Sequence, residues 1–310
     1  MPVIAVIGEA VADAFLPAEA AGGLDLRITP GGSPANTAVA LSRLGTSARF
    51  LGRLSTGPLG RLLRGHLTES GVDLSASVDT ERKATLAVAA LDADGRADYD
   101  FYAEGTADWH WTPAELARLA EVPVEAVHTG SLALALPPGA GAIRDALAEA
   151  RTSATVSVDP NARPGIVDAA TYRERLPLWL PLADIVKVSD EDLAYIHPGE
   201  DPLDVCDRWH EQGVALVVVT RGGEGATASL RGERVEVPAV PVDLVDTVGA
   251  GDSFTAGLLH TLGRLGRLGG RLDALTATEL REALDFAALV SARTCATEGA
   301  NPPWARELAT

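Results

Sequence analysis

Apolar runs and amphipathic segments alternate regularly over the second half of the chain. From about Val124, the strand-like runs are AVHTGSLAL, ATVSVD, ADIVKVS and ALVVVT, and the helix-like segments between them are GAIRDALAEAR, YRERLPLWL and DVCDRWHEQG. Strands that are apolar along nearly their whole length are typical of a parallel sheet that is covered on both faces. The pattern therefore predicts an α/β protein with a doubly wound, mostly parallel sheet flanked by helices on both faces.

The N-terminal part of the chain begins with the same kind of alternation. VIAVIGEA reads as a buried strand, and the turn in ITPGG is followed by the helix-like SPANTAVALSRLG. We expect Ser33 to be the N-cap of this helix, with Pro34 at its first position and Gly45 at its end, since these residue types favour those positions.

A hairpin then interrupts the alternation. The stretch ATLAVAALDADGRADYDFY reads as two strands around the turn DADG, at a place where a helix would be expected. We interpret it as part of a small β-sheet lid, formed by approximately residues 11–29 and 84–104. The lid and the α/β part are predicted to form one domain that spans residues 1–310.

Composition and charge exclude several classes of protein. The chain has 310 residues, 46 % of them hydrophobic, and a mean hydropathy of +0.11, which argues for a folded core and against disorder. Its formal net charge of −17 argues against nucleic acid or an anionic membrane as a partner. Cys206 and Cys295 are the only cysteines, too few for a disulfide framework or a cysteine-based zinc site. The sequence has no apolar run of membrane-spanning length and no basic leader region, so we expect a cytoplasmic protein.

The stretch DTVGAGDSF is the strongest candidate for phosphate chemistry. Gly249, Ala250 and Gly251 have small side chains, so their N–H groups can turn toward one point at the start of a helix and form an anion pocket. Asp252 then has two interpretations: an ordinary helix N-cap, or a general base that takes a proton from a hydroxyl attacking a phosphoryl group. Because a carboxylate beside this pocket would repel phosphate, a metal ion is implied.

Two other phosphate-binding patterns can be weighed against it. The lysine-containing P-loop GxxxxGK[ST] is absent. Gly223, Gly225 and Ala228 come close to a dinucleotide fingerprint, but the residues that follow alternate like a strand, whereas that fingerprint requires a helix. A tight turn is the simpler interpretation of these glycines.

Two long motifs together resemble the signatures of a known family. DTVGAGDSFTAGLL is similar to the C-terminal signature of the ribokinase-like (PfkB) carbohydrate kinases, and GGSPANTAVALSRLG is similar to their N-terminal signature. GEAVADAF, SVDPNARP, VKVSDEDL, VTRGGEGA and TEGANPPW follow in the family's order, so the resemblance covers essentially the whole chain. It implies a ribokinase-like α/β fold with a β-lid over a sugar, and transfer of the γ-phosphate of ATP to a primary hydroxyl.

The resemblance also implies roles for individual residues. It makes Asp252 the catalytic base, with an anion hole at Gly249, Ala250 and Gly251. The sugar contacts that it implies are Asp13, Gly31, Gly32 and Asn36. A carboxylate and an amide can hold neighbouring hydroxyls, and glycines admit a close ligand, so the chemistry agrees. The competing interpretations are a turn acid for Asp13 and a polar first-turn residue for Asn36. Phe101 would cover the apolar face of the sugar, or else pack in the hairpin core.

The phosphate and metal contacts follow from the same resemblance. Asn161 and Arg163 match a polar substrate-binding pair near the phosphates, and Arg163 could supply the cation that a P-loop lysine would give; otherwise it is a surface arginine. Lys187, Ser189 and Asp192 stand where the family usually has an Asn-x-x-Glu arrangement near magnesium and phosphate. Here Ser replaces Asn and Asp replaces Glu, and shorter side chains favour contact through water, which magnesium tolerates.

The nucleotide loop and a second ion complete the expected site. Thr220, Gly222 and Gly225 resemble the nucleotide-binding loop. Asp246, with backbone carbonyls near Val248 and Gly299, resembles the loop that binds a monovalent cation in family members activated by potassium. The expected cofactors are thus ATP and Mg²⁺, with K⁺ as a candidate activator.

The sequence says less about the sugar. GEAVAD, KVSDED, GANPP and FYAEGTADWHW resemble bacterial fructokinases, which favours fructose and the product fructose 6-phosphate. Ribose, 2-keto-3-deoxygluconate and a nucleoside stay open, since one or two hydrogen-bonding side chains decide among them. A non-catalytic sugar or nucleotide sensor on the same scaffold is a remote alternative. By analogy with the family, a homodimer through the lid is also expected.

Overall fold

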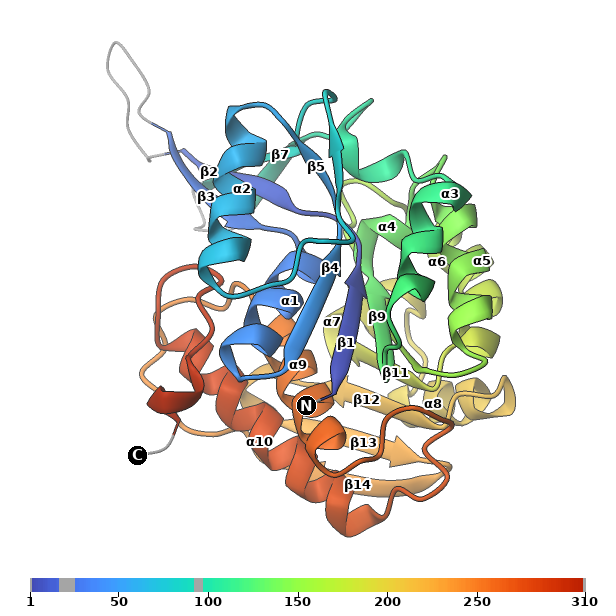
Figure 1. Ribbon diagram of the computed structural model, residues 1–310. Coiled ribbons are helices and arrows are strands. Elements are labelled where there is room, and N and C mark those ends of the chain that lie inside the picture. The colour runs from blue at the N-terminus through green and yellow to red at the C-terminus, as the bar shows by residue number, and fades with distance from the viewer. Residues whose placement is uncertain (1, 17–25, 92–96, 309–310) are drawn as a thin grey trace.

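A computed structural model of the chain describes residues 2–16, 26–91 and 97–308, and its central feature is an eight-stranded sheet (Figure 1). The strands of this sheet are, in spatial order, β14 (Glu233–Val237), β13 (Ala226–Leu230), β12 (Leu216–Thr220), β11 (Ile185–Ser189), β10 (Thr155–Asp159), β9 (Ala126–Gly130), β1 (Val3–Ile7) and β4 (Ser47–Leu51). Neighbouring strands from β4 to β12 are parallel, whereas β12, β13 and β14 form an antiparallel meander. The predicted doubly wound, mostly parallel sheet is confirmed.

Helices cover both faces of the sheet (Figure 1). On one face lie α1 (Ser33–Arg43), α2 (Pro58–Glu69), α9 (Ala250–Arg264) and α10 (Ala277–Cys295); on the other lie α3 (Pro113–Leu116), α4 (Ser131–Ala135), α5 (Ala140–Ala150), α6 (Ala169–Trp179), α7 (Asp190–Ile196) and α8 (Pro202–Glu211). Successive residues of β1 divide between two cores: Ile4 and Val6 pack with the first group of helices, and Ala5 and Ile7 with the second. This alternation follows from the pleat of a strand that is buried on both faces.

A second, smaller sheet of four strands contains segments that were predicted to form the lid, and it is called the lid below. Its order is β3 (Arg27–Gly31), β2 (Val11–Phe15), β7 (Leu86–Leu91) and β8 (Ala97–Tyr102). The hairpin of β7 and β8 confirms the interruption predicted from the sequence, and β2 joins it in parallel with β7. Residues 17–25 and 92–96 of the predicted lid lie outside the described part of the chain. The sequence pattern missed a two-stranded sheet of β5 (Arg53–Ser55) and β6 (Val78–Thr80).

One expectation about local structure is wrong and another is confirmed. The first helix begins one residue earlier than predicted: Gly32, with a φ of 97°, is the N-cap of α1, and Ser33 is already helical. An antiparallel strand and no helix begins directly after Gly225, at Ala226, which confirms the tight turn and excludes the dinucleotide fingerprint. Within the described residues, no helix is both long and apolar enough to cross a membrane.

Candidate active site

The carboxylate of Asp252 is held at the start of α9 by two side chains of α1. Ser33 Oγ donates a hydrogen bond of 2.6 Å to Asp252 Oδ1, and Asn36 Nδ2 donates one of 2.9 Å to Oδ2. Gly249, in the left-handed conformation, is the N-cap of α9, so Asp252 lies in the first turn and caps nothing. The N-cap interpretation of Asp252 is therefore wrong, and its carboxylate faces the α1 side chains.

The turn before Asp252 presents backbone donors. Ala250 N donates to the carbonyl oxygen of Thr247 at 3.2 Å, so this amide is already engaged. The amides of Gly249, Gly251 and Asp252 have no acceptor in the described part of the protein. Three N–H groups at a helix start, where the helix dipole adds to their charge, make a suitable place for a phosphoryl oxygen.

Lys187 lies against this turn and belongs to a buried ion pair. A Cβ atom on Gly251 would be 2.7 Å from Lys187 Nζ, so a larger residue here would displace the ammonium group. Lys187 Nζ donates to Asp159 Oδ2 at 3.0 Å, and both side chains are at most 5 % exposed. Burial lowers the pKa of Lys187, but the carboxylates of Asp159 and Asp192 outweigh it and leave the pKa above its ordinary value. Lys187 therefore keeps its charge beside the amides.

Asp159 also orients Arg163, the other predicted cation, through Asn161. Its Oδ1 accepts a hydrogen bond of 3.1 Å from the N–H of Asn161, which has a left-handed φ of 39°. Asn161 Oδ1 in turn accepts from Arg163 Nη1 at 2.8 Å. The buried Nδ2 of Asn161 has no hydrogen-bond acceptor among the residues that the structure describes, and so is available to a ligand. Sequence reasoning missed Asp159, although the DPN motif at the end of a strand marked it.

The lid contributes Asp13, and the predicted glycines make room for it. A Cβ atom on Gly31 would come within 1.9 Å of Asp13 Oδ2, and one on Gly32 within 2.8 Å of the Glu9 carbonyl oxygen. Burial raises the pKa of Asp13 to about 7; Arg163 lowers it and Asp252 raises it. The last two effects indicate that Asp13 lies near enough to Arg163 and Asp252 for their charges to act on it.

Phe101 lies on the same side of the lid as Asp13. The strand register places Asp13 opposite Ala87, and Ala87 opposite Phe101, so the three side chains form one row across the sheet. Phe101 is half-buried. This position agrees with the predicted cover over a sugar.

Burial determines the proton affinity of Asp252. It raises the pKa of the carboxyl above its ordinary value, whereas the two hydrogen bonds from α1 and the Lys187 ammonium oppose this rise in part. A buried base with a raised pKa binds a proton more strongly than an exposed carboxylate. The environment thus suits Asp252 to proton abstraction.

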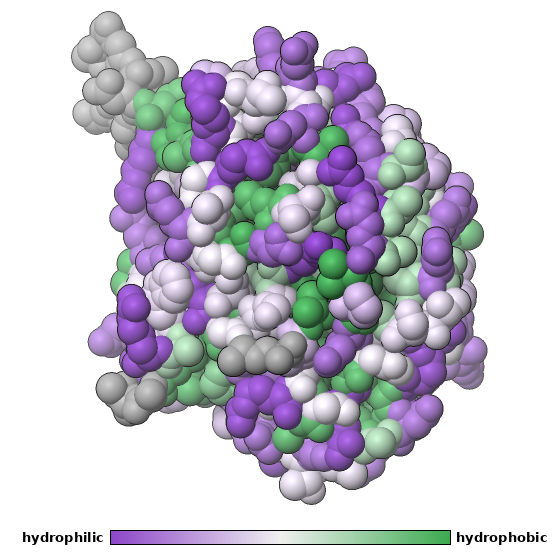
Figure 2. Space-filling model, in the orientation of Figure 1, coloured by the Kyte–Doolittle hydropathy of each residue, from purple (hydrophilic) through white to green (hydrophobic). Residues whose placement is uncertain are grey.

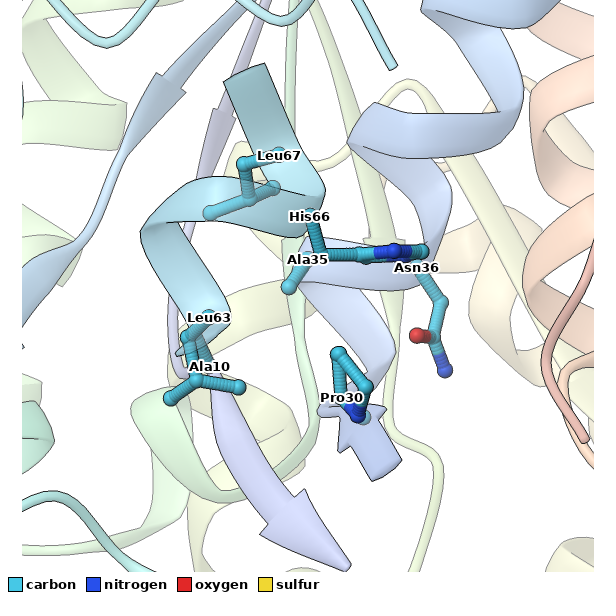
Figure 3. A pocket seen from close by; sticks show the side chains of 8 residues that line it. Ala10, Pro30, Ala35, Asn36, Leu63, His66 and Leu67 are labelled. Atoms are coloured by element: carbon cyan, nitrogen blue, oxygen red, sulfur yellow. The ribbon is translucent and has the colours of Figure 1, made fainter. Parts of the chain in front are cut away.

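A small pocket adjoins Gly31 and Asn36, two of the predicted sugar contacts. Figure 3 shows the side chains of Asn36 and Pro30 together with His66, whose ring extends from α2 toward Asn36. Its lining residues are Ala10, Pro30, Gly31, Ala35, Asn36, Leu63, His66 and Leu67. No sequence pattern pointed to His66, because only the packing of α2 beside α1 brings it close.

The residues predicted to lie near magnesium occupy the end of β11 and the first turn of α7. Ser189 Oγ accepts from Asp192 N at 3.0 Å, and Asp192 Oδ1 accepts from Ala162 N at 3.0 Å. Burial and Asp159 raise the pKa of Asp192. Within the described ranges, no three His, Cys, Asp or Glu side chains group closely enough to hold a metal. A metal here would therefore need water and phosphate oxygens as further ligands, which is the ordinary situation for Mg²⁺.

Asp246 joins the two loops that were predicted to hold a monovalent cation. Its Oδ1 accepts from Val248 N at 3.1 Å, and its Oδ2 accepts from Gly299 N at 2.8 Å. The carboxylate therefore serves as a brace between the loops, directly before the Gly249 turn.

The loop that was predicted to bind the nucleotide begins at the end of β12, at the same edge of the sheet. Thr220 Oγ1 is 3.5 Å from the Val188 carbonyl oxygen. Gly222 is left-handed and borders open space, whereas a Cβ atom on Gly225 would be 2.1 Å from the Val237 carbonyl oxygen. Gly225 is thus required by the turn, and Gly222 leaves room beside it.

The fold and these groups define a phosphotransferase site, and comparison with known proteins agrees. The model of the pfkB family of carbohydrate kinases matches residues 1–306. A fructokinase of Rhizobium leguminosarum bv. trifolii is 39 % identical over 234 residues, 75 % of this chain and 71 % of that protein, and one of Klebsiella pneumoniae is 36 % identical over 261 residues, 83 % of each. The chain belongs to the pfkB family of carbohydrate kinases, which makes it a sugar phosphotransferase.

Solved structures show the same likeness. The fructokinase of Xylella fastidiosa with bound ATP has a TM-score of 0.88 at 28 % identity, with 99 % of this chain and 97 % of that chain covered. The fructokinase of Vibrio cholerae O395 with fructose, ADP and calcium ion has a TM-score of 0.81 at 26 % identity, with 97 % and 94 % covered. The predicted ribokinase-like fold is confirmed.

Proposed function

We propose that this chain is an ATP-dependent fructose kinase, which transfers the γ-phosphate of ATP to a primary hydroxyl and yields fructose 6-phosphate. The observation that carries the proposal is the Asp252 carboxylate, buried beside open amides at the start of α9 and near Asp13 of the lid. The similar proteins named as fructokinases, one of them with fructose and ADP bound, support fructose as the acceptor.

In the proposed reaction, Asp252 removes the proton of the sugar hydroxyl as its oxygen bonds to the γ-phosphorus. The bond from that phosphorus to the bridging oxygen of ADP breaks, and ADP leaves. The amides of Gly249, Gly251 and Asp252 stabilise the charge on the transferring group. Lys187 and Arg163 supply positive charge near it.

The sugar would be bound between the lid and α1. Asp13 and Asn36 offer an acceptor and a donor to neighbouring hydroxyls, Gly31 and Gly32 allow a close approach, and Phe101 covers the apolar face. A lid in this place would keep water from the phosphoryl group and so limit ATP hydrolysis. This arrangement requires residues 1–310 to act as one kinase domain, with a lid of about 11–29 and 84–104.

The proposed cofactors are Mg²⁺ and, as an activator, K⁺. Asp192 would hold Mg²⁺ mainly through water, close to Ser189, and the ion would neutralise phosphate charge. Asp246 would hold K⁺ indirectly, by keeping the carbonyls near Val248 and Gly299 together. Thr220, Gly222 and Gly225 would lie along the nucleotide. Because ATP is a substrate, we place the reaction in the cytoplasm.

The outer face of the lid supports a homodimer. Leu86 and Val88 pair with Ala12 and Ala14, on the side of the sheet that is opposite to Asp13. Apolar groups gather at the lid in Figure 2, and a hollow on it is lined by Leu16, Leu26, Leu86, Val88, Ala90, Asp100 and Tyr102. Tyr102 is 56 % exposed. Exposed apolar patches often mark interfaces, and sedimentation of wild type and Tyr102→Asp would test this one.

The test of the function is an ADP-release assay on the purified chain with ATP and Mg²⁺, with and without K⁺. The acceptors are fructose, ribose, 2-keto-3-deoxygluconate and a set of nucleosides. We expect the highest kcat/KM for fructose and the loss of turnover in Asp252→Asn. If another acceptor has a higher kcat/KM, that compound replaces fructose as the proposed substrate. Tight sugar binding without turnover would favour a sensor.

A further inference from the structure

A buried carboxylate outside the proposed reaction site joins separate segments at the base of the lid. Asp108, in the single turn Ala107–Trp109, is 1 % exposed. Its Oδ1 accepts a hydrogen bond of 3.1 Å from Ala10 N, and its Oδ2 accepts one of 2.6 Å from Thr85 Oγ1. Both partners are far from it in sequence, so the contacts depend on the tertiary fold.

The three residues lie on three of the connecting segments that enter or leave the lid, and we call these segments passages. Ala10 leads into β2, Thr85 leads into β7, and Asp108 follows the exit from β8. The fourth passage runs from β3 into α1 through Gly32, where a Cβ atom would be 2.8 Å from the Glu9 carbonyl oxygen. Gly32 thus packs on the first passage, whose Ala10 is bound to Asp108.

The neighbouring passage residues are themselves anchored. Glu9, next to Ala10, accepts a hydrogen bond of 3.2 Å from Ala133 N of α4. Ala12 N donates to the carbonyl oxygen of Thr85 at 3.0 Å. A shift of the Asp108 carboxylate would therefore be passed to β2, which carries Asp13.

The hydroxyl groups of Thr85 and Thr106 form a row of hydrogen bonds beside Asp108. An uncharged side chain at position 108 can donate into this row. Thr85 Oγ1 is 2.7 Å from Thr106 Oγ1, and Thr106 Oγ1 donates to the Ala103 carbonyl oxygen at 2.8 Å. A protonated Asp108 can donate to Thr85, which donates to Thr106, so each donor finds one acceptor. Burial raises the pKa of Asp108 to about 6, despite the hydrogen bonds from Thr85 and Ala10 that lower it. An asparagine amide could make the same contacts.

We propose that Asp108 is a positioning residue that fixes the lid on the main sheet and thereby places Asp13 over Asp252. It acts through Ala10 and Thr85 and touches no reacting atom. The inference rests on the proposed function, because its kinetic consequence is a looser sugar site beside an unchanged nucleotide site.

The test compares Asp108→Ala, Asp108→Asn and Thr85→Val with Thr261→Val. Thr261 is a fitting control because it is a buried threonine of α9 whose hydroxyl has no partner in the part of the chain described. In Asp108→Ala and Thr85→Val, we expect the KM for fructose to rise about threefold to tenfold, in keeping with the loss of one or two buried hydrogen bonds. The KM for ATP should stay the same, and Asp108→Asn should behave like the wild type.

A second measurement does not depend on turnover. In Thr85→Val, the Ala10 amide keeps its acceptor on Asp108, and the Ala12 amide keeps the Thr85 carbonyl. Faster hydrogen exchange at these two amides would therefore report a looser lid base, and Thr261→Val should leave them unchanged. This exchange test stands even if Asp108→Ala fails to fold.

The outcomes separate this inference from the proposed function. If the wild type uses another sugar, the kinetic comparison moves to that sugar; if it uses none, the proposed function fails and hydrogen exchange alone decides. Unchanged exchange and unchanged sugar KM in Thr85→Val would overturn the positioning role. A parallel rise in the KM for ATP, or an Asp108→Asn variant as impaired as Asp108→Ala, would also overturn it.

Discussion

The Ser33 hydroxyl donates a hydrogen bond of 2.6 Å to the carboxylate of Asp252, although 219 positions separate the two residues. Ser33 opens α1 and Asp252 lies in the first turn of α9, and the two helices pack against each other. Asn36, one turn further along α1, holds the second carboxylate oxygen. The start of α1 thus both borders the lid and orients the candidate base.

Replacement of Asp252 by asparagine tests the base directly. Asp252→Asn can keep contacts to Ser33 and Asn36 but cannot accept a proton at neutral pH. We expect turnover to fall about 10²–10⁴-fold, the usual contribution of a general base, with ATP affinity unchanged. Steady-state kinetics and calorimetric titration of ATP measure both quantities. Turnover at the wild-type rate would end the assignment of the base.

Removal of the Ser33 hydroxyl should shift the pH dependence of activity. The hydrogen bond from Ser33 lowers the pKa of Asp252, so its loss in Ser33→Ala raises that pKa further. Because the base must be deprotonated, the acidic limb of kcat/KM should move to higher pH. At pH values well above this limb, the activity of Ser33→Ala should return to that of the wild type.

The control is Ser42→Ala, near the opposite end of the same helix, and its pH profile should match the wild type. A shift of the limb to lower pH in Ser33→Ala would contradict the role given to this hydroxyl.

Gly251→Ala tests the closeness of Lys187 to the anion pocket. A Cβ atom at this position would be 2.7 Å from Lys187 Nζ, and the ammonium cannot move freely because Asp159 holds it. We expect the displaced charge and amide to lower kcat by up to about 10²-fold, as small misplacements in active sites can do. Gly141→Ala, where a new Cβ would meet nothing within 4 Å in α5, is the matched control. Equal kinetics for both variants would show that the contact is unimportant.

The sequence allowed the chemistry of Asp252 to be predicted, because a small-residue turn, a carboxylate and a helix are neighbours along the chain. Ser33 was assigned as a cap because serine before a helix favours that role, and only the packing of α1 on α9 shows that its hydroxyl points to Asp252 instead. Asp159 and Asp108 escaped prediction for a related reason. Their partners Lys187, Ala10 and Thr85 lie on other parts of the chain, and although the DPN motif marked Asp159, no local pattern shows that these groups come together.

The Lys187–Asp159 pair should be costly to break on one side only. In Lys187→Met, the Asp159 carboxylate would remain buried without its cation, and we expect the free energy of unfolding to fall by about 3–5 kcal/mol. The double variant Lys187→Met with Asp159→Asn removes both charges, so it should recover much of the lost free energy of unfolding. Its kinase activity should stay absent, because the cation beside the anion pocket is gone. Urea unfolding of the wild type, both single variants and the double variant gives the coupling free energy. If each single change cost as little as the double one, the pair would contribute no electrostatic stabilisation, and the charge placed beside Gly251 would need another explanation.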